Sequence, residues 1–465
     1  MSVGARVAAL TNDALLRRNV ILNLLTWILP AASALVAIPI LARQLGEARF
    51  GMLSLGWAAV GLFSFFDFGL GRALTKMIAE RSARSAADDI PDLLWTSAWV
   101  LGAISLCLTA IGLTAAPFLA HKALHVPVAF QGEATNVVRW LAIGVLPMAH
   151  GVVLRGVLEA EQRFGTANRL RVPLGVATYL GPLLVIPFHG GAAAAVGVIV
   201  FARTVYWLAH LPILEHVTPG LLRPRAYSPA AARELFAAGG WITLSNILAP
   251  IIGQGDRIAI AVGLPIAASG WYGIASEVAT KQWLFTSALQ PVLFAALATT
   301  IVHDPGRAAA LVDRAMKVTM LTLFPVTLVL LIFAEPGLRW WTGPAFALPA
   351  VASLRWLALG VYVNASAQVP YAALQGGAGA RGPALLHLAE LPAYAALLFV
   401  LVPRMGVEGA ALAFCIRMIL DATLMWAMAS RELPAIRRTA VRSAWLGGAM
   451  LSAFAGVWMW NAHPG

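Results

Sequence analysis

Seven charged side chains are the clearest of those inside long apolar runs of this sequence, where a charge is costly unless it has a partner or a wet cavity. Four are cations and three are acids: Arg203, Lys281, Arg355, Arg417, Glu277, Glu390 and Asp421. The cations could bind phosphate or another anion, and the carboxylates could balance them. We therefore predict a weakly basic cavity in which the four cations bind substrate and the three acids are their charge partners.

Spacing suggests how some of these charges are arranged. Glu277 and Lys281 are four residues apart, as are Arg417 and Asp421, so each pair can meet on one helix face. The alternative for both pairs is mutual neutralisation inside a helix bundle. Arg203 is near the middle of its apolar run, which favours a cavity-lining position.

Two further charges lack an opposite charge four residues away: Arg355 and Glu390. Arg355 is nearer the end of its run, so its side chain could instead extend to the membrane interface. Arg155 and Glu159, again four residues apart, are predicted to form an interfacial pair at the end of a span.

Other polar residues give weaker signals. The histidines within apolar runs, His150, His210 and His387, could carry protons, but we expect them to be packing residues. Neither Cys107 nor Cys415 has a CxxC or Cys/His partner. No His or Asp cluster has metal-ligand spacing, so neither a metal nor another cofactor is predicted.

Composition identifies the elements that must hold these charges. Of 465 residues, 60% are hydrophobic and 12% charged, and the mean hydropathy of +0.78 excludes a soluble globule. Apolar runs long enough to cross a bilayer recur along the chain, without the alternation of a membrane barrel. The sequence predicts an all-α polytopic membrane protein. Its spans are expected near 20–41, 50–70, 93–116, 138–159, 172–188, 192–214, 235–256, 268–299, 311–334, 348–374, 383–402 and 408–430, with an extra run near 443–460.

Basic residues indicate the orientation, because they are retained on the cytoplasmic side. With a cytoplasmic N-terminus, 21 of the 33 Lys and Arg residues fall inside, seven outside and five within spans. This bias accounts for most of the net charge of +12, so no nucleic-acid partner is predicted. The loops are too short for an extramembrane domain.

Two halves of the chain show a weak internal repeat. Asn23 and the pair Phe50-Gly51 recur as Asn246 and Tyr272-Gly273, offset by 223 and 222 residues. Because each half has an even number of spans, the repeat is parallel. We predict a six-helix bundle over 1–221, a cytoplasmic linker over 222–233, a second six-helix bundle over 234–432 and an additional span within 433–465.

Several motifs carry a family resemblance. The first half contains IPILARQLG ending at Gly46, FGMLSL from Phe50 and DFGLG from Asp67, and the second contains DRIAIAVGL from Asp256 and WYGIASE from Trp271. These segments resemble the Wzx-type polysaccharide or O-antigen flippases of the multidrug/oligosaccharidyl-lipid/polysaccharide exporter superfamily. The resemblance implies two bundles around a central cavity and alternating access. The implied cargo is polyprenyl-pyrophosphate-linked oligosaccharide, moved across the bacterial cytoplasmic membrane.

The cationic cavity fits that anionic cargo, since the arginine fork can donate paired hydrogen bonds to pyrophosphate. A polysaccharide polymerase and chain-length machinery are the implied partners, with the lipid bilayer. One alternative is a multidrug cation antiporter of the same superfamily, which would need accessible carboxylates. A membrane glycosyltransferase or polymerase needs surface apparatus for which the short loops leave little room. The related peptidoglycan-precursor flippases typically have fourteen spans, more than are predicted here.

Overall fold

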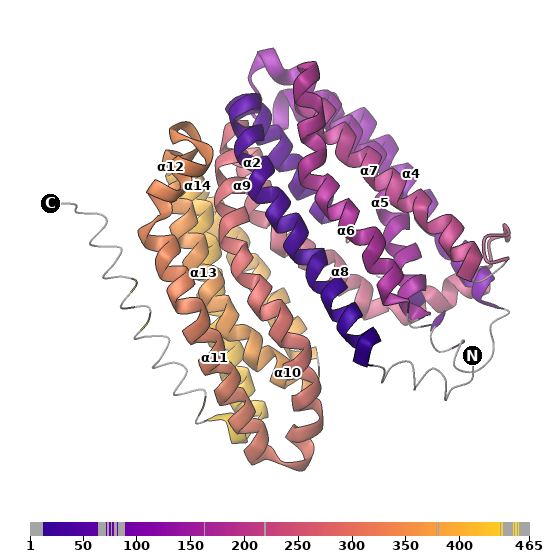
Figure 1. Ribbon diagram of the computed structural model, residues 1–465, viewed down its shortest axis with the longest axis vertical. Helices are drawn as coiled ribbons and strands as arrows, with labels where there is room; N and C mark the ends of the chain where they lie inside the picture. The colour runs from indigo at the N-terminus through magenta and orange to yellow at the C-terminus, as the bar shows by residue number, and fades with distance from the viewer. Residues whose placement is uncertain are drawn as a thin grey trace. The chain divides into compact units, whose positions relative to one another are not determined.

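The architecture is entirely helical in the part of the chain that the structure describes. A computed structural model describes residues 13–63, 71, 74–75, 77–78, 81, 89–161, 163–217, 220–377, 379, 381–437, 439, 450, 452 and 454. Every regular element among these residues is a helix, and no strand occurs among them (Figure 1). The predicted all-α class is therefore confirmed.

The chain forms two compact units, Met1–Gln254 and Gly255–Gly465. The first contains α2 (Asp13–Phe63), α4 (Ile90–Phe118), α5 (Gln131–Ala160), α6 (Phe164–Leu180), the 3₁₀ helix η4 (Gly181–Phe188) and α7 (Ala192–Val217). Helix α8 (Pro229–Gly263) contains the division between the units. The second unit continues with α9 (Ile266–Ala279), η5 (Thr280–Gln282), α10 (Trp283–His303), α11 (Pro305–Ile332), α12 (Ala334–Thr342), α13 (Pro344–Gly377) and α14 (Arg381–Glu432). The predicted domain boundaries at 222–233 and 433 stay predictions.

Helix α2 is a hairpin that contains the first two expected spans. Pro30 packs against Gly175 of α6, and the Trp57 indole donates a hydrogen bond to the Thr178 carbonyl, 3.0 Å away. A straight helix would separate residues 30 and 57 by about 40 Å, whereas residues 175 and 178 lie within one turn. The chain must therefore reverse between them, and the only non-helical residue inside α2 is Gly46, at φ 73° and ψ 173°.

Gly46 should be required for this reversal, because its positive φ is strained for any residue with a Cβ. We expect Gly46→Ala to cost about 1–3 kcal/mol and to lower the thermal unfolding temperature of the purified protein. Gly132→Ala is the matched control: it also meets no atom within 4 Å but lies in α5 without a positive φ. Equal unfolding temperatures for the two variants would contradict the assigned role of Gly46.

A helix lies over the described part of each of the twelve expected spans. Among the described residues, eight helices are long and apolar enough to cross a membrane, and α2 and α14 each cover two expected spans. Residues 64–70, at the end of the second span, lie outside the described residues, as does most of 443–460, the extra span. Of that extra span, Phe454 is buried and stacks on Phe324 of α11, with ring centroids 5.0 Å apart.

The eighth expected span, 268–299, is divided rather than continuous. The 3₁₀ segment η5, which contains Lys281 and the buried Gln282, separates α9 from α10. The Gln282 amide donates to the Ala358 carbonyl at 3.2 Å and accepts from the Thr327 hydroxyl at 2.7 Å. These bonds anchor the break to α13 and α11, which is how irregular backbone is tolerated at membrane depth.

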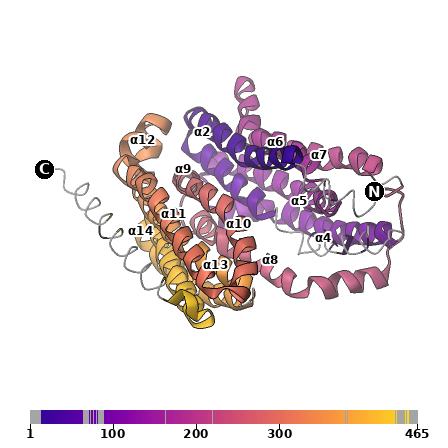
Figure 2. The same cartoon turned by 60° about the horizontal axis from the view of Figure 1, so that its bottom comes forward.

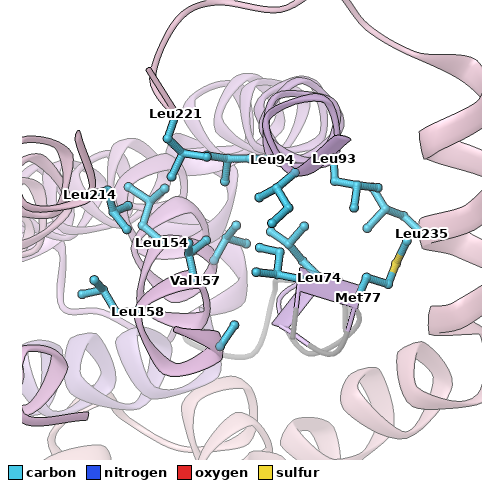
Figure 3. Close-up of a cluster of buried hydrophobic side chains, with 14 of the residues drawn as sticks. Leu74, Met77, Leu93, Leu94, Leu154, Val157, Leu158, Leu214, Leu221 and Leu235 are labelled. Atoms are coloured by element: carbon cyan, nitrogen blue, oxygen red, sulfur yellow. The ribbon is translucent and has the colours of Figure 1, made fainter. Parts of the chain in front are cut away.

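Each unit has its own apolar core. In the first, leucine side chains from α4, α5, α7 and α8 converge with Leu74 and Met77 (Figure 3). In the second, α13 contacts α9, α10, α11 and α14, and Figures 1 and 2 show it among these helices. Phe50 and Tyr272, proposed as equivalent positions of the repeat, are both fully buried. Their equivalence stays a prediction.

Candidate functional site

Three arginines from three helices gather in the first unit. Arg155 lies on α5, Arg171 on α6 and Arg203 on α7, and all three are within electrostatic reach of Tyr206. We call these residues the arginine cluster. Tyr206 follows Arg203 by three positions on α7, so the two side chains share a helix face.

Small residues bring α5 and α7 close enough to form the arginine cluster. Gly151 of α5 faces the Tyr206 ring, and Gly144 of α5 faces Val200. A side chain at either glycine would meet these neighbours. Close approach through small residues is the usual packing of helices in membranes, and here it places Arg155 and Arg203 on facing elements.

The guanidinium groups of the arginine cluster are incompletely satisfied by the described residues. The Arg203 Nε is buried and has no hydrogen-bond partner among them. The Arg155 Nε is 3.3 Å from Glu159 Oε1, but the geometry is not that of a hydrogen bond. Arg171 lies over the Trp27 ring, 5.4 Å from its centroid. Three guanidinium groups and one carboxylate leave two excess positive charges, so the arrangement can receive a doubly charged anion.

The structure brings Arg203 together with two residues that sequence reasoning set aside. The expected fifth span begins at residue 172 and so excludes Arg171, but α6 begins at Phe164 and contains it. Arg155 does pair with Glu159 as expected, yet it also neighbours Arg171. One signal in the sequence could have indicated the cluster. Arg155 lies near the end of the fourth expected span, and Arg171 directly precedes the fifth.

A second polar group occupies the α14 hairpin. Arg417 Nε is 3.6 Å from Glu390 Oε2, and His387 Nε2 is 3.2 Å from Asp421 Oδ1. Their spacing allows Arg417 and Asp421 to meet, but each of them lies against a residue of the other arm instead. The chain reverses at Gly406, at φ 62°, so partners come from opposite arms rather than from one helix face.

The remaining predicted cations also belong to the second unit. Lys281 pairs with Glu277 on adjacent turns, as its spacing predicted. Arg355 donates from Nε to the Leu331 carbonyl at 3.3 Å, at the end of α11 and within reach of Glu335 on α12. That position suits an interfacial side chain, the alternative reading of Arg355. The substrate role of these residues stays a prediction.

In the parts of the chain described here, no three His, Cys, Asp or Glu side chains gather as a metal site.

Comparison with known sequences places the chain in a family. The family described as polysaccharide biosynthesis protein matches residues 40–347. The chain belongs to this family. It is also 26% identical over 415 residues to a Shigella flexneri protein named "Putative O-antigen transporter", covering 88% of this chain and 96% of that protein.

Two solved structures of low sequence identity share the fold of this polysaccharide biosynthesis family member. One is the inward-facing conformation of a multidrug resistance MATE family transporter of the MOP superfamily, with a TM-score of 0.76, 14% identity and coverage of 89% and 96%. The other is the lipid II flippase MurJ in an inward closed conformation, with a TM-score of 0.70, 11% identity and coverage of 96% and 99%. The chain is thus a multi-span membrane protein with the fold common to these two structures.

Proposed function

We propose that this protein is a flippase of surface polysaccharide biosynthesis, moving polyprenyl-pyrophosphate-linked oligosaccharide across the bacterial cytoplasmic membrane by alternating access. The observation that carries the proposal is the arginine cluster, with two excess positive charges inside a membrane-spanning unit. Family membership and the similarity to a protein named as an O-antigen transporter support it.

The chemistry of the arginine cluster matches a pyrophosphate bridge. A pyrophosphate diester carries two negative charges, which match in number and oppose in sign the net charge of +2 on Arg155, Arg171, Arg203 and Glu159. Arginine forks donate paired hydrogen bonds to phosphate oxygens, and the buried Arg203 Nε has a donor to offer. The glycan is too polar to cross hydrocarbon, whereas the polyprenyl chain can remain in lipid.

The membrane potential would drive an anionic cargo outward if the N-terminus is cytoplasmic, as the basic residues predict. Each charge that crosses a negative-inside potential is worth about 2.3 kcal/mol per 100 mV. A dianion would gain roughly twice that amount. The same field would return an emptied cationic site toward the cytoplasm.

A multidrug cation carrier is the alternative, and the similarity to a multidrug transporter fold gives it a basis. Such a carrier needs a carboxylate that a cation can reach. In the second unit, Glu390 lies against Arg417 and Glu277 against Lys281, while Asp256 accepts a hydrogen bond from Tyr272. These contacts make the acids poor receptors for an organic cation.

A binding competition separates the two functions. Full-length protein in nanodiscs should bind a fluorescent short-chain polyprenyl pyrophosphate, and inorganic pyrophosphate should displace it while tetraphenylphosphonium should not. Arg171→Ala should weaken binding about 10- to 100-fold, the usual loss for a charged hydrogen bond, whereas the exposed Arg163→Ala should bind normally. Displacement by the cation, or equal binding by both variants, would contradict the proposal.

Lys281, Arg355 and Arg417 remain proposed contacts for later stages of cargo movement, with Glu277, Glu390 and Asp421 as their charge partners. Of the two ion-paired cations, Lys281 is more accessible than Arg417, with 38% of its side chain exposed against 11%. A polysaccharide polymerase and its chain-length machinery remain predicted partners.

A further inference from the structure

The short helix α12 joins two membrane spans of the second unit. Phe333 separates it from the end of α11, and Gly343 separates it from the start of α13. Its 9 residues form a helix about 14 Å long, against about 30 Å for the hydrocarbon layer, so α12 is too short to cross a membrane. Figures 1 and 2 show it at one end of the second unit. It therefore lies where α11 and α13 leave the hydrocarbon.

One side of α12 packs against the protein. Ala334, Leu338 and Thr342 are buried, and their spacing of four residues puts them on the same side of the helix. Helix α12 contacts both α13 and α11. Arg355 of α13 also lies within electrostatic reach of Glu335 on α12. These contacts hold α12 in place beside the two spans that it joins.

The other residues of α12 form two flanks of different chemistry. Successive residues of a helix are turned by about 100°, so Glu335 and Arg339 lie on one flank, where they form an ion pair of 2.9 Å. The same rotation puts Gly337, Trp340 and Trp341 on the opposite flank. Trp340 is 82% exposed. The helix thus has a buried side, a charged flank and an aromatic flank.

Phospholipid is the partner that fits the aromatic flank. Exposed apolar side chains continue from α12 onto the adjoining spans: Phe333 is 56% exposed, and both Val329 on α11 and Leu348 on α13 are exposed. Exposed apolar residues at the ends of spans are the surface that meets the bilayer. Tryptophan is enriched where a membrane meets water, because its ring is apolar and its indole nitrogen is polar. The charged flank, on the other side of α12, suits headgroups and water.

We propose that α12 is an interfacial helix that binds phospholipid at the boundary between the headgroups and the acyl chains. Its three sides meet three media: the buried side meets the protein, the charged flank meets water and the aromatic flank meets lipid. Trp340 then fixes the depth of α12 in the membrane, and with it the depth at which α11 and α13 end. With the cytoplasmic N-terminus that the basic residues predict, this lipid belongs to the outer leaflet.

Spin labels on single cysteines measure the position of α12 without any cargo, so the outcome is independent of the proposed flippase function. The full-length background carries Cys107→Ser and Cys415→Ala, and nanodiscs of phosphatidylethanolamine and phosphatidylglycerol supply the lipid. Gly337→Cys labels the aromatic flank; a Cβ there meets no atom within 4 Å, and Trp340 is retained. Arg339→Cys labels the charged flank of the same helix.

The measured quantity is the ratio of two collision rates, one with oxygen, which concentrates in lipid, and one with a water-soluble nickel chelate. The ratio for Gly337→Cys should be several times that for Arg339→Cys. It should also lie between the ratios of two reference labels: Leu321→Cys, exposed near the middle of α11, and Ala226→Cys, exposed in the loop before α8.

Equal ratios on the two flanks of α12 would overturn the proposal, as would a ratio for Gly337→Cys outside the interval between the reference labels. A protein partner that covers the aromatic flank in place of lipid would leave Gly337→Cys as accessible to water as Ala226→Cys, because the purified protein is measured alone. That result would also overturn the proposal.

The anchoring role of Trp340 is tested with the same label. Adding Trp340→Ser to Gly337→Cys should move the label toward water and lower the ratio, because apolar area in contact with lipid is lost. Phe399→Ser is the matched control, since it also removes a highly exposed aromatic ring from the second unit, but on α14. It should leave the ratio unchanged. The same ratio with and without Trp340→Ser would contradict the anchoring role.

Discussion

Arg203→Ala should abolish the export of surface polysaccharide while the protein accumulates in the membrane at its normal level. Arg203 joins Arg155 and Arg171 around Tyr206, and its buried Nε is unpartnered among the described residues. Because Arg203 has no acidic partner among the described residues, its removal leaves no buried carboxylate without a counter-charge, and folding should be preserved. Loss of about 3 kcal/mol of charged hydrogen bonding corresponds to roughly 100-fold in rate.

Conservative and control substitutions make the Arg203 result specific. Arg203→Lys should restore part of the export, because the charge returns without the paired geometry of the fork. The exposed Arg139→Ala, on α5 of the same unit, should export normally. Normal export by Arg203→Ala, or failure explained by lost protein abundance, would make Arg203 a structural residue.

Arg417→Ala should instead lower the abundance of folded protein. Its side chain is 11% exposed, lies 3.6 Å from the buried Glu390 and stacks over Tyr394, 5.1 Å from the ring centroid. Removing one partner of a buried pair leaves an uncompensated charge and typically costs about 3–5 kcal/mol. Membrane-fraction immunoblots and thermal unfolding in detergent measure this loss.

A double substitution tests whether the loss comes from the Glu390 charge that Arg417→Ala leaves without a partner. Arg417→Met with Glu390→Leu should recover most of the abundance, since apolar replacement of a buried pair is often tolerated. Arg404→Ala, at an exposed position on α14, should accumulate like the wild type. If the double variant were as depleted as Arg417→Ala, the Glu390 contact would not explain the effect.

Sequence reasoning recovered the helical class and the buried charges because both depend on local composition. An apolar run of sufficient length must form a helix in lipid, and a charge within it stands out against its neighbours. The pair Glu277 and Lys281 was predictable for the same reason, since one helix brings residues four apart together.

The partners of Arg417 and Asp421 were not predictable from helical spacing. Residues 390 and 417, like 387 and 421, meet only because Gly406 reverses the chain between them. Several residues between the two arms are of types that are common in turns. Their spacing alone does not say at which of them the chain reverses. The arginine cluster was missed for a related reason: Arg171 was assigned outside its span, although α6 begins seven residues before it.

Translocation by the purified protein tests the central claim most directly. Vesicles containing full-length wild type, Arg203→Ala or no protein would be loaded with a lipid-linked oligosaccharide bearing a fluorophore on its glycan. A membrane-impermeant quencher then reports how much glycan reaches the outer surface over time. The account predicts rapid, complete quenching with wild type and only the slow background of protein-free vesicles with Arg203→Ala. Equal quenching in wild-type and protein-free vesicles would contradict it.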